Sequence, residues 1–256
     1  MTLLETIAVA FSMYSAIPMP QFEWNQKNMR FAMCAFPLIG LVIGGGEYLL
    51  FCLCNLLAVP ELLRGALLCM LPIWITGGIH LDGYSDTCDA LASHKSPEEK
   101  QKIMKDPHVG SFAVIKIAIY LLLTFALWTS LPAFHAGEIL FLFCISRILS
   151  GLAVCSFPLA KSSGLAYTFA EATDKKKARG FLLFMLILCS IGEVFLGGVE
   201  GLAALLIALL LFGYYYLMSK KQFGGLSGDL AGWFLQTCEL LMLCGIYLLQ
   251  LLENLR

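Results

Sequence analysis

The chain has 256 residues, of which 59% are hydrophobic and only 14% are charged, and its mean hydropathy is +0.80. This composition is too apolar for an ordinary soluble domain and predicts an integral membrane protein. The net charge of −1, from 17 basic and 18 acidic residues, provides no global field that would attract a nucleic acid. We therefore expect a lipid bilayer, and no nucleic acid, among the partners.

The apolar runs indicate about seven membrane spans in a polytopic helical bundle, an all-α fold. The first apolar stretch, residues 2–17, ends at Pro18 and is short for a span, so we expect it to lie in the membrane interface or to re-enter. It lacks the preceding basic region and the following cleavage site of a signal peptide, and we therefore expect it to stay attached to the protein. The predicted spans are residues 31–59, 62–81, 111–130, 138–157, 180–197, 202–218 and 230–252.

The connectors are short, and no internal repeat or low-complexity segment is visible. Residues 1–256 are therefore predicted to form a single membrane-embedded domain. The ten cysteines are scattered, mostly within apolar runs, and form no C-x-x-C pair, so we interpret them as small buried apolar residues. A zinc site at His80 and Cys88 is the alternative, but two ligands do not make such a site.

The basic residues are distributed unevenly between the two sides of this map. Arg64 and Arg256 fall on one side, whereas the other side holds thirteen of the 17. Because basic loops stay in the cytoplasm, we predict a multi-pass protein of the cell membrane whose basic side is cytoplasmic. The thirteen residues are Lys27, Arg30, Lys95, Lys100, Lys102, Lys105, Lys161, Lys175, Lys176, Lys177, Arg179, Lys220 and Lys221.

Three aspartates follow directly after one of the predicted spans. Asp82, Asp86 and Asp89 are spaced i, i+4 and i+7, which places their carboxylates on one face of a helix. Three like charges on one stripe repel, but the arrangement becomes favourable when divalent cations lie between them, and hard oxygen ligands suit Mg²⁺ or Mn²⁺. The alternative is a solvated acidic helix start near the positive end of the helix dipole. The preceding apolar run favours the metal site.

Other polar groups lie at the same predicted cytoplasmic level. Lys105, beside Asp106, can supply positive charge to a phosphate. Asp229 follows three glycines within residues 224–228, where the last loop meets the final span. Glycines there permit tight turns and let backbone N–H groups approach a phosphate, and Asp229 can add a metal ligand. An Asp229 that only caps the final helix is the alternative, which the sequence leaves open.

Several ionisable residues lie within the predicted spans. Arg147 is a specific candidate for contact with phosphate because it lies inside an apolar run. Glu47, Glu193 and Glu239 lie away from the aspartates, and for them we favour structural hydrogen bonding over an ion path. The lysine run at residues 175–177 is interpreted as a topological signal that also attracts anionic lipid headgroups.

Clustered aspartates at a membrane surface most naturally indicate phosphoryl or nucleotidyl transfer. Mg²⁺ in such a site neutralises a diphosphate and stabilises charge on the leaving phosphate. One carboxylate can act as the base towards an attacking hydroxyl. The sequence does not indicate which carboxylate has this role.

The order and spacing of several motifs resemble those of one family. The motifs are IPMP at residues 17–20, FPLIG at 36–40, HLDGYSDTCD at 80–89, IMKDPHVG at 103–110, SR at 146–147 and GGLSGD at 224–229. Together they resemble the cobalamin synthase (adenosylcobinamide-GDP ribazoletransferase) family over most of the chain. The departures, at Tyr84, Ser85, Cys88 and residues 90–92, concern fine substrate preference rather than the class of reaction.

The resemblance implies that a ribose hydroxyl of α-ribazole, or of its 5′-phosphate, attacks the cobinamide-linked phosphate of adenosylcobinamide-GDP, and that GMP leaves. It implies Mg²⁺ as the cofactor and leaves a homo-oligomeric state open. The residues implied as metal ligands are Asp82, Asp86 and Asp89, with Asp106 or Asp229 completing the set. Lys105 and Arg147 are implied as phosphate contacts.

Two other functions are consistent with parts of this pattern. A membrane transferase that makes phospholipid head groups also uses clustered aspartates, but its longer D-x-x-D-G-x-x-A-R pattern requires an Ala-Arg that is missing here. An ion-coupled transporter would use the glutamates within the spans, but it leaves the aspartate group unexplained. We therefore expect a phosphate-group transferase.

Overall fold

The structure is a computed structural model that describes residues 3–131, 136–160 and 165–255. Within these ranges the chain is helical, with one isolated bridge between Leu159 and Leu226, so the predicted all-α class is confirmed. The helices are α1 Leu3–Tyr14, α2 Gln26–Met29, α3 Ala32–Leu56, α4 Glu61–Thr76, α5 Ile79–Ala92, α6 Pro97–Ile103, α7 Ser111–Ser130, α8 Ala136–Ser156, α9 Leu165–Ala172, α10 Lys175–Phe223 and α11 Gly228–Asn254.

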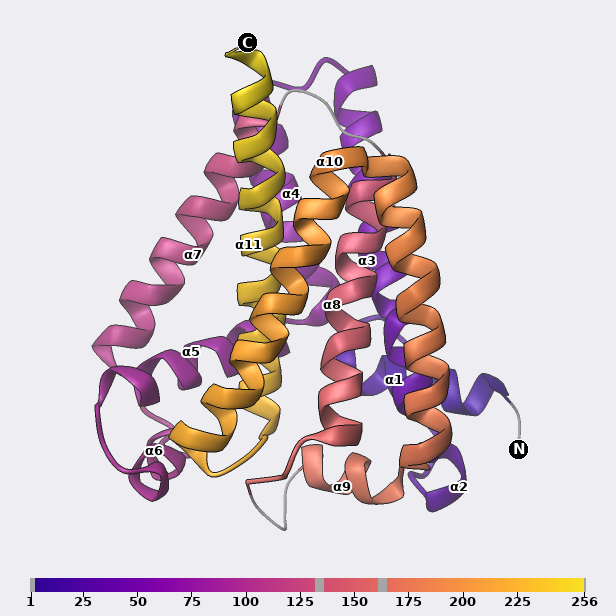
Figure 1. Ribbon diagram of the computed structural model, residues 1–256, viewed down its shortest axis with the longest axis vertical. Helices are drawn as coiled ribbons and strands as arrows, with labels where there is room; N and C mark the ends of the chain where they lie inside the picture. Colours follow the sequence, from indigo (N-terminus) through magenta and orange to yellow (C-terminus); the bar gives the residue numbers. More distant parts are fainter. Residues whose placement is uncertain (1–2, 132–135, 161–164, 256) are drawn as a thin grey trace.

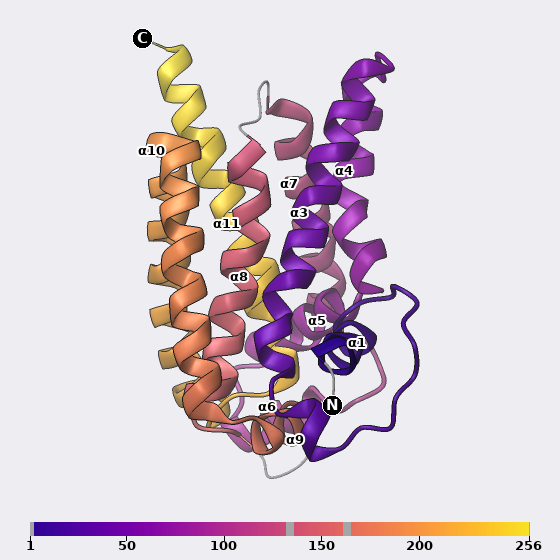
Figure 2. The same ribbon diagram turned by 90° about the vertical axis from the view of Figure 1, so that its right-hand side faces the viewer.

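The long helices run along the axis of the bundle, whereas the short helices α1, α2, α5, α6 and α9 lie at one end of it (Figures 1 and 2). We call this end the polar end. Helix α8 lies inside the bundle between α3 and α10, and side chains such as Ile145 and Ile148 are fully buried. The close packing of α3 on α8 depends on Gly40, where a Cβ atom would lie only 2.4 Å from the carbonyl oxygen of Phe143.

Five of the described helices are long and apolar enough to cross a membrane, and α4 with α5 would add a bent sixth. Helix α10 is counted once although its 49 residues would extend for roughly 74 Å, far beyond a bilayer core of about 30 Å. It folds back at Gly198, whose φ of 55° and ψ of −128° are not helical (Figure 1). With α4 and both arms of α10 counted, the chain passes along the bundle seven times, as the apolar runs predict.

The predicted span at residues 62–81 is too long. Helix α4 ends at Thr76, because Gly77 and Gly78 adopt left-handed conformations with φ of 65° and 79° that other residues rarely adopt. The axes of α4 and α5 differ in direction by 96°. The three aspartates therefore lie on a separate helix that crosses the polar end, outside the long helices, rather than at the tip of a span.

The predicted uneven distribution of basic residues is found between the two ends of the bundle. The described members of the basic set lie in or beside α2, α6 and the two ends of α10, all at the polar end (Figure 1). Arg64 lies at the start of α4, towards the other end, and donates a hydrogen bond of 2.9 Å to Asn55. Lys161 and Arg256 lie outside the described residues. Helix α1, predicted to be too short for a span, has 12 residues and lies at the polar end.

Candidate active site

A cavity of about 490 Å³ lies at the polar end, lined by residues of α1, α3, α5, α8, α9 and α11 and of the loop after α6. Three of the predicted site residues, Asp82, Lys105 and Asp229, line it. They come from two helices and a loop that are far apart in the sequence. The volume is within the range of about 300–1,000 Å³ that is typical of small-molecule sites.

Two glycines bring the aspartates of α5 next to Asp229. A Cβ atom on Gly83 would lie 2.8 Å from both the Cα and the carbonyl oxygen of Asp229, and one on Gly232 would lie 2.7 Å from the carbonyl oxygen of His80. Helices α5 and α11 therefore cross in backbone contact. The close crossing that Gly83 and Gly232 allow was not predicted from the sequence. The available signal is their position, since one glycine directly follows Asp82 and the other lies three residues after Asp229.

Four carboxylates interact electrostatically at this crossing. Burial, and the charges of Asp82, Asp229 and Asp89, raise the pKa of Asp86 to about 6. None of the ion pairs among the described residues includes a carboxylate of α5. The described part of the chain holds no group of three or more His, Cys, Asp or Glu side chains arranged to hold a metal ion, so the metal site stays a prediction. The acidic oxygen donors fit a hard divalent cation, which would offset their mutual repulsion.

The position of Asp89 depends on the residue that precedes α7. A Cβ atom on Gly110, the N-cap of α7, would lie 2.1 Å from both carboxylate oxygens of Asp89. Only glycine leaves room for the carboxylate in this position. The carboxylate also lies at the N-terminal end of α7, where the helix dipole favours negative charge.

Lys105 and Asp106 are adjacent in sequence but differ in their surroundings. Helix α6 is fixed to the end of α10, because Lys100 donates a hydrogen bond to Gln222 and the Gln101 side chain donates one of 2.6 Å to the carbonyl oxygen of Phe223. This contact holds the following loop, and Lys105 lines the cavity. Asp106 does not line it.

Asp106 instead pairs locally. Its Oδ1 accepts a hydrogen bond of 3.0 Å from the backbone N–H of His108 and lies 2.7 Å from Nδ1 of the same residue. These bonds lower the pKa of Asp106, which is exposed. The structure therefore does not bring Asp106 to the other carboxylates.

Asp229 lies in the first turn of α11 but is not its cap. The N-cap is Ser227, whose side chain accepts a hydrogen bond from the backbone N–H of Leu230, so the interpretation of Asp229 as a cap is wrong. The preceding glycines have local roles. Gly224 ends α10 with φ of 73°, and Gly225, with φ of 148°, packs against the backbone of residues 158–160.

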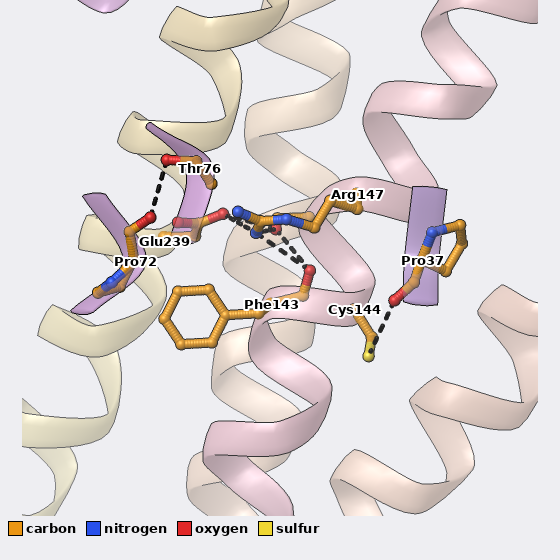
Figure 3. A network of polar contacts seen from close by, with 8 residues as sticks. Pro37, Pro72, Thr76, Phe143, Cys144, Arg147 and Glu239 are labelled. Atoms are coloured by element: carbon orange, nitrogen blue, oxygen red, sulfur yellow. Dashed lines mark hydrogen bonds and ion pairs between the residues drawn. The ribbon is translucent and has the colours of Figure 1, made fainter. Parts of the chain in front are cut away.

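Arg147 is buried inside the bundle and does not line the cavity (Figure 3). It donates hydrogen bonds to the carboxylate of Glu239, to Oγ of Ser146 at 3.0 Å and to the carbonyl oxygen of Phe143 at 3.2 Å. Glu239 also accepts a hydrogen bond of 2.8 Å from Ser146. The predicted structural role of Glu239 is confirmed, whereas the structure does not place Arg147 where a phosphate in the cavity would lie.

The other two glutamates of the spans differ from Glu239. Both carboxylate oxygens of Glu47 and of Glu193 are buried, and neither carboxylate has a hydrogen-bond partner within the described ranges. The structural hydrogen bonding predicted for them is therefore wrong in this structure. Neither residue lines the cavity.

His80 is a residue of the cavity that sequence reasoning considered only as a zinc ligand. It is 5% exposed, and its ring lies 6.2 Å from that of Tyr14 and 6.0 Å from that of Phe36, between ring centroids. Its Nε2 has no hydrogen-bond partner in the described part of the chain. Burial, and the charge of Arg147, lower the pKa of His80 to about 3, so the ring is neutral at pH 7. Since the described residues contain no group of three metal-binding side chains, the zinc alternative gains no support.

Comparisons with known proteins identify relatives over almost the whole chain. The family model for cobalamin-5-phosphate synthase matches residues 6–247. An adenosylcobinamide-GDP ribazoletransferase of Lachnoclostridium phytofermentans is 44% identical over 93% of this chain and 91% of its own. Proteins with the same name from Clostridium perfringens and Desulfitobacterium hafniense are 36% and 33% identical, over 94% and 93% of this chain and 98% and 95% of theirs. No solved structure matches.

Proposed function

This chain belongs to the cobalamin-5-phosphate synthase family, a family of cobalamin biosynthesis, and we propose that it is an adenosylcobinamide-GDP ribazoletransferase. It joins adenosylcobinamide-GDP to α-ribazole or its 5′-phosphate and releases GMP. The observation that supports this most is the gathering of Asp82, Asp229 and Lys105 on the wall of one cavity, with Asp86 and Asp89 beside them.

The reaction is a substitution at phosphorus. The ribose hydroxyl oxygen of α-ribazole forms a bond to the cobinamide-linked phosphorus, and the bond from that phosphorus to the bridging oxygen breaks, so GMP leaves with the electron pair. The hydroxyl proton passes to a carboxylate of the site, which acts as general base. Lys105 contacts the diphosphate and offsets its charge.

The aspartates are the residues that would hold Mg²⁺. Their fit to the ion follows from the donor set, which is all carboxylate. Burial, and after it the charges of Asp82, Asp229 and Asp89, raise the pKa of Asp86, and a divalent cation would offset the repulsion between these charges. The bound ion supplies neutralisation of the diphosphate and stabilises charge on the leaving phosphate. Asp82, Asp86, Asp89 and Asp229 are the proposed ligands. Asp106 is not included in this set, because it does not line the cavity and His108 already occupies one of its carboxylate oxygens.

We place the site at the cytoplasmic face of the membrane. Apart from Lys161, the basic set lies within the described residues at the polar end, the same end as the cavity. Because basic loops are retained in the cytoplasm, this end faces inward. Both proposed substrates are polar and would reach the cavity from the cytoplasm, while the long apolar helices anchor the enzyme in the bilayer.

The proposal is tested by GMP release and product mass with purified protein in nanodiscs, adenosylcobinamide-GDP, α-ribazole phosphate, and either Mg²⁺ or EDTA. The joined corrinoid and equimolar GMP are expected with Mg²⁺ and not with EDTA. Asp82→Asn, Asp86→Asn and Asp89→Asn are each expected to lower turnover by about 100-fold or more. Asp106→Asn, which removes an exposed carboxylate outside the cavity, is the matched control. Near-normal turnover in all three folded variants would refute the assignment.

A further inference from the structure

The acidic and basic groups occupy only part of the cavity wall. Much of the remainder is formed by apolar and aromatic side chains, including Met13, Tyr14, Met33, Phe36 and Val154. A diphosphate gains nothing from such a surface. This part of the wall therefore suits an uncharged, flat and apolar group, and aromatic rings pack well against a planar ligand.

One buried polar atom in this apolar part has no hydrogen-bond partner within the described ranges. Nε2 of His80 is buried and has no hydrogen-bond partner among the described residues, although His80 lines the cavity between Tyr14 and Phe36. Buried polar atoms in native proteins are nearly always hydrogen bonded, and an orphan is costly. A ligand in the cavity can provide the missing partner.

We propose that this cavity is the subsite for the base of the ribazole substrate, with the planar base packed against Tyr14 and Phe36 and its free ring nitrogen hydrogen bonded to Nε2 of His80. The inference rests on the proposed function and deepens it. Asp82 follows His80 by two residues and lines the same cavity. A base held by His80 therefore places the attached ribose, with its attacking hydroxyl, towards the carboxylates.

The size and polarity of the cavity distinguish ribazole from the other parts of the substrates. About 490 Å³ accommodates one nucleoside, whereas a corrin ring with its side chains is several times larger. Guanine has several donors and acceptors along one edge and would leave most of them unpaired against Met13, Met33 and Val154. The base of ribazole, a benzimidazole, has one free ring nitrogen, which matches the unpartnered Nε2 of His80.

The test is calorimetric titration of α-ribazole into the purified protein in nanodiscs with EDTA present, so that the metal plays no part. Wild-type protein is expected to bind α-ribazole, and guanosine is expected not to displace it. His80→Leu should weaken binding by about 10-fold, the effect of one lost hydrogen bond to a buried group. His80→Gln, whose amide can donate from a similar position, should retain binding within about threefold. In turnover assays, His80→Leu should raise KM for ribazole and leave KM for adenosylcobinamide-GDP unchanged.

A second pair of variants keeps the test valid if His80→Leu does not fold. Val154→Phe fills the cavity and should abolish binding, whereas Leu210→Phe, on the exposed surface of α10, should not. The subsite is refuted if folded wild-type protein does not bind α-ribazole, if guanosine displaces it, or if folded His80→Leu and Val154→Phe bind as tightly as wild type.

The transferase is tested separately by GMP release with Mg²⁺. Protein that binds α-ribazole through His80 but releases no GMP keeps the subsite and refutes the transferase. If the protein releases GMP but binds α-ribazole equally well in the His80 and Val154 variants, the transferase is supported and the subsite is refuted.

Discussion

The carboxylate of Asp89, in α5, lies against the backbone of Gly110, the N-cap of α7. The spacing of the aspartates correctly predicts a helix with three carboxylates on one face, because that face follows from helix geometry alone. The spacing does not predict the role of Gly110 or the orphan nitrogen of His80. Both depend on contacts between segments, and a sequence pattern contains no information about which distant segment covers a given side chain.

Replacement of Gly110 by alanine should impair activity more than stability. The new Cβ atom would lie 2.1 Å from both carboxylate oxygens of Asp89, and the short aspartate side chain must turn away from its position. We expect turnover to fall by at least about 10-fold, because misplacement of a reacting group by about 1 Å can cost up to 100-fold. The melting temperature should change little. Gly180→Ala is the control, since no atom lies within 4 Å of a Cβ atom there. Equal kinetics in the two variants would show that Asp89 does not need its present position.

The buried pair of Arg147 and Glu239 should be structural. Glu239→Ala leaves a buried guanidinium without its carboxylate partner, and we expect a loss of about 3–5 kcal/mol in the free energy of unfolding. The double variant Arg147→Met/Glu239→Leu removes both charges and should recover most of that loss. Because Arg147 does not line the cavity, the double variant should also retain turnover within a few-fold. A stable double variant without activity would instead support the phosphate contact implied by the family resemblance.

At the scale of whole helices, the site depends on where the chain breaks. Apolar run length predicts the bundle well, because a bilayer requires helices of a certain length whatever their sequence. It places the end of α4 too late, although it correctly separates residues 180–197 from residues 202–218, the two arms of α10 on either side of the break at Gly198. Hydropathy averages over many residues, whereas each break depends on one or two glycines with unusual backbone angles.

The crossing of α5 and α11 can be tested at Gly83. Alanine there places its Cβ atom 2.8 Å from the backbone of Asp229, which cannot move as a side chain can, so the two helices must separate. We expect a lower melting temperature together with a loss of Mg²⁺-dependent turnover, because the carboxylates of the two helices move apart. Gly213→Ala, in α10 and outside the cavity wall, meets no atom within 4 Å and should leave both quantities near wild type. A Gly83→Ala protein with normal turnover would contradict a site shared by the two helices.

At the scale of the molecule, the two ends of the bundle differ in composition and in structure. The polar end holds the short helices, the cavity and the described members of the basic set. Towards the opposite end, Arg64 of α4 is 9% exposed and bonded to Asn55. The count of basic residues predicts this asymmetry from sequence because it requires only the correct number of crossings. The sequence does not reveal that α1 and α9 contribute Tyr14 and Tyr167 to the cavity wall.

The orientation of the whole molecule leads to a prediction about its C-terminal end. Seven passages along the bundle place the end of α11 opposite the polar end, and Figure 1 shows this separation. If the polar end is cytoplasmic, alkaline phosphatase fused to the C-terminus should be active and green fluorescent protein fused there should be dark. The same reporters inserted in the loop before α6, at residue 95, should give the reverse result. A fluorescent C-terminal fusion with an inactive phosphatase fusion would invert the orientation and place the cavity outside the cell. Cytoplasmic substrates would then have to be exported before they could react.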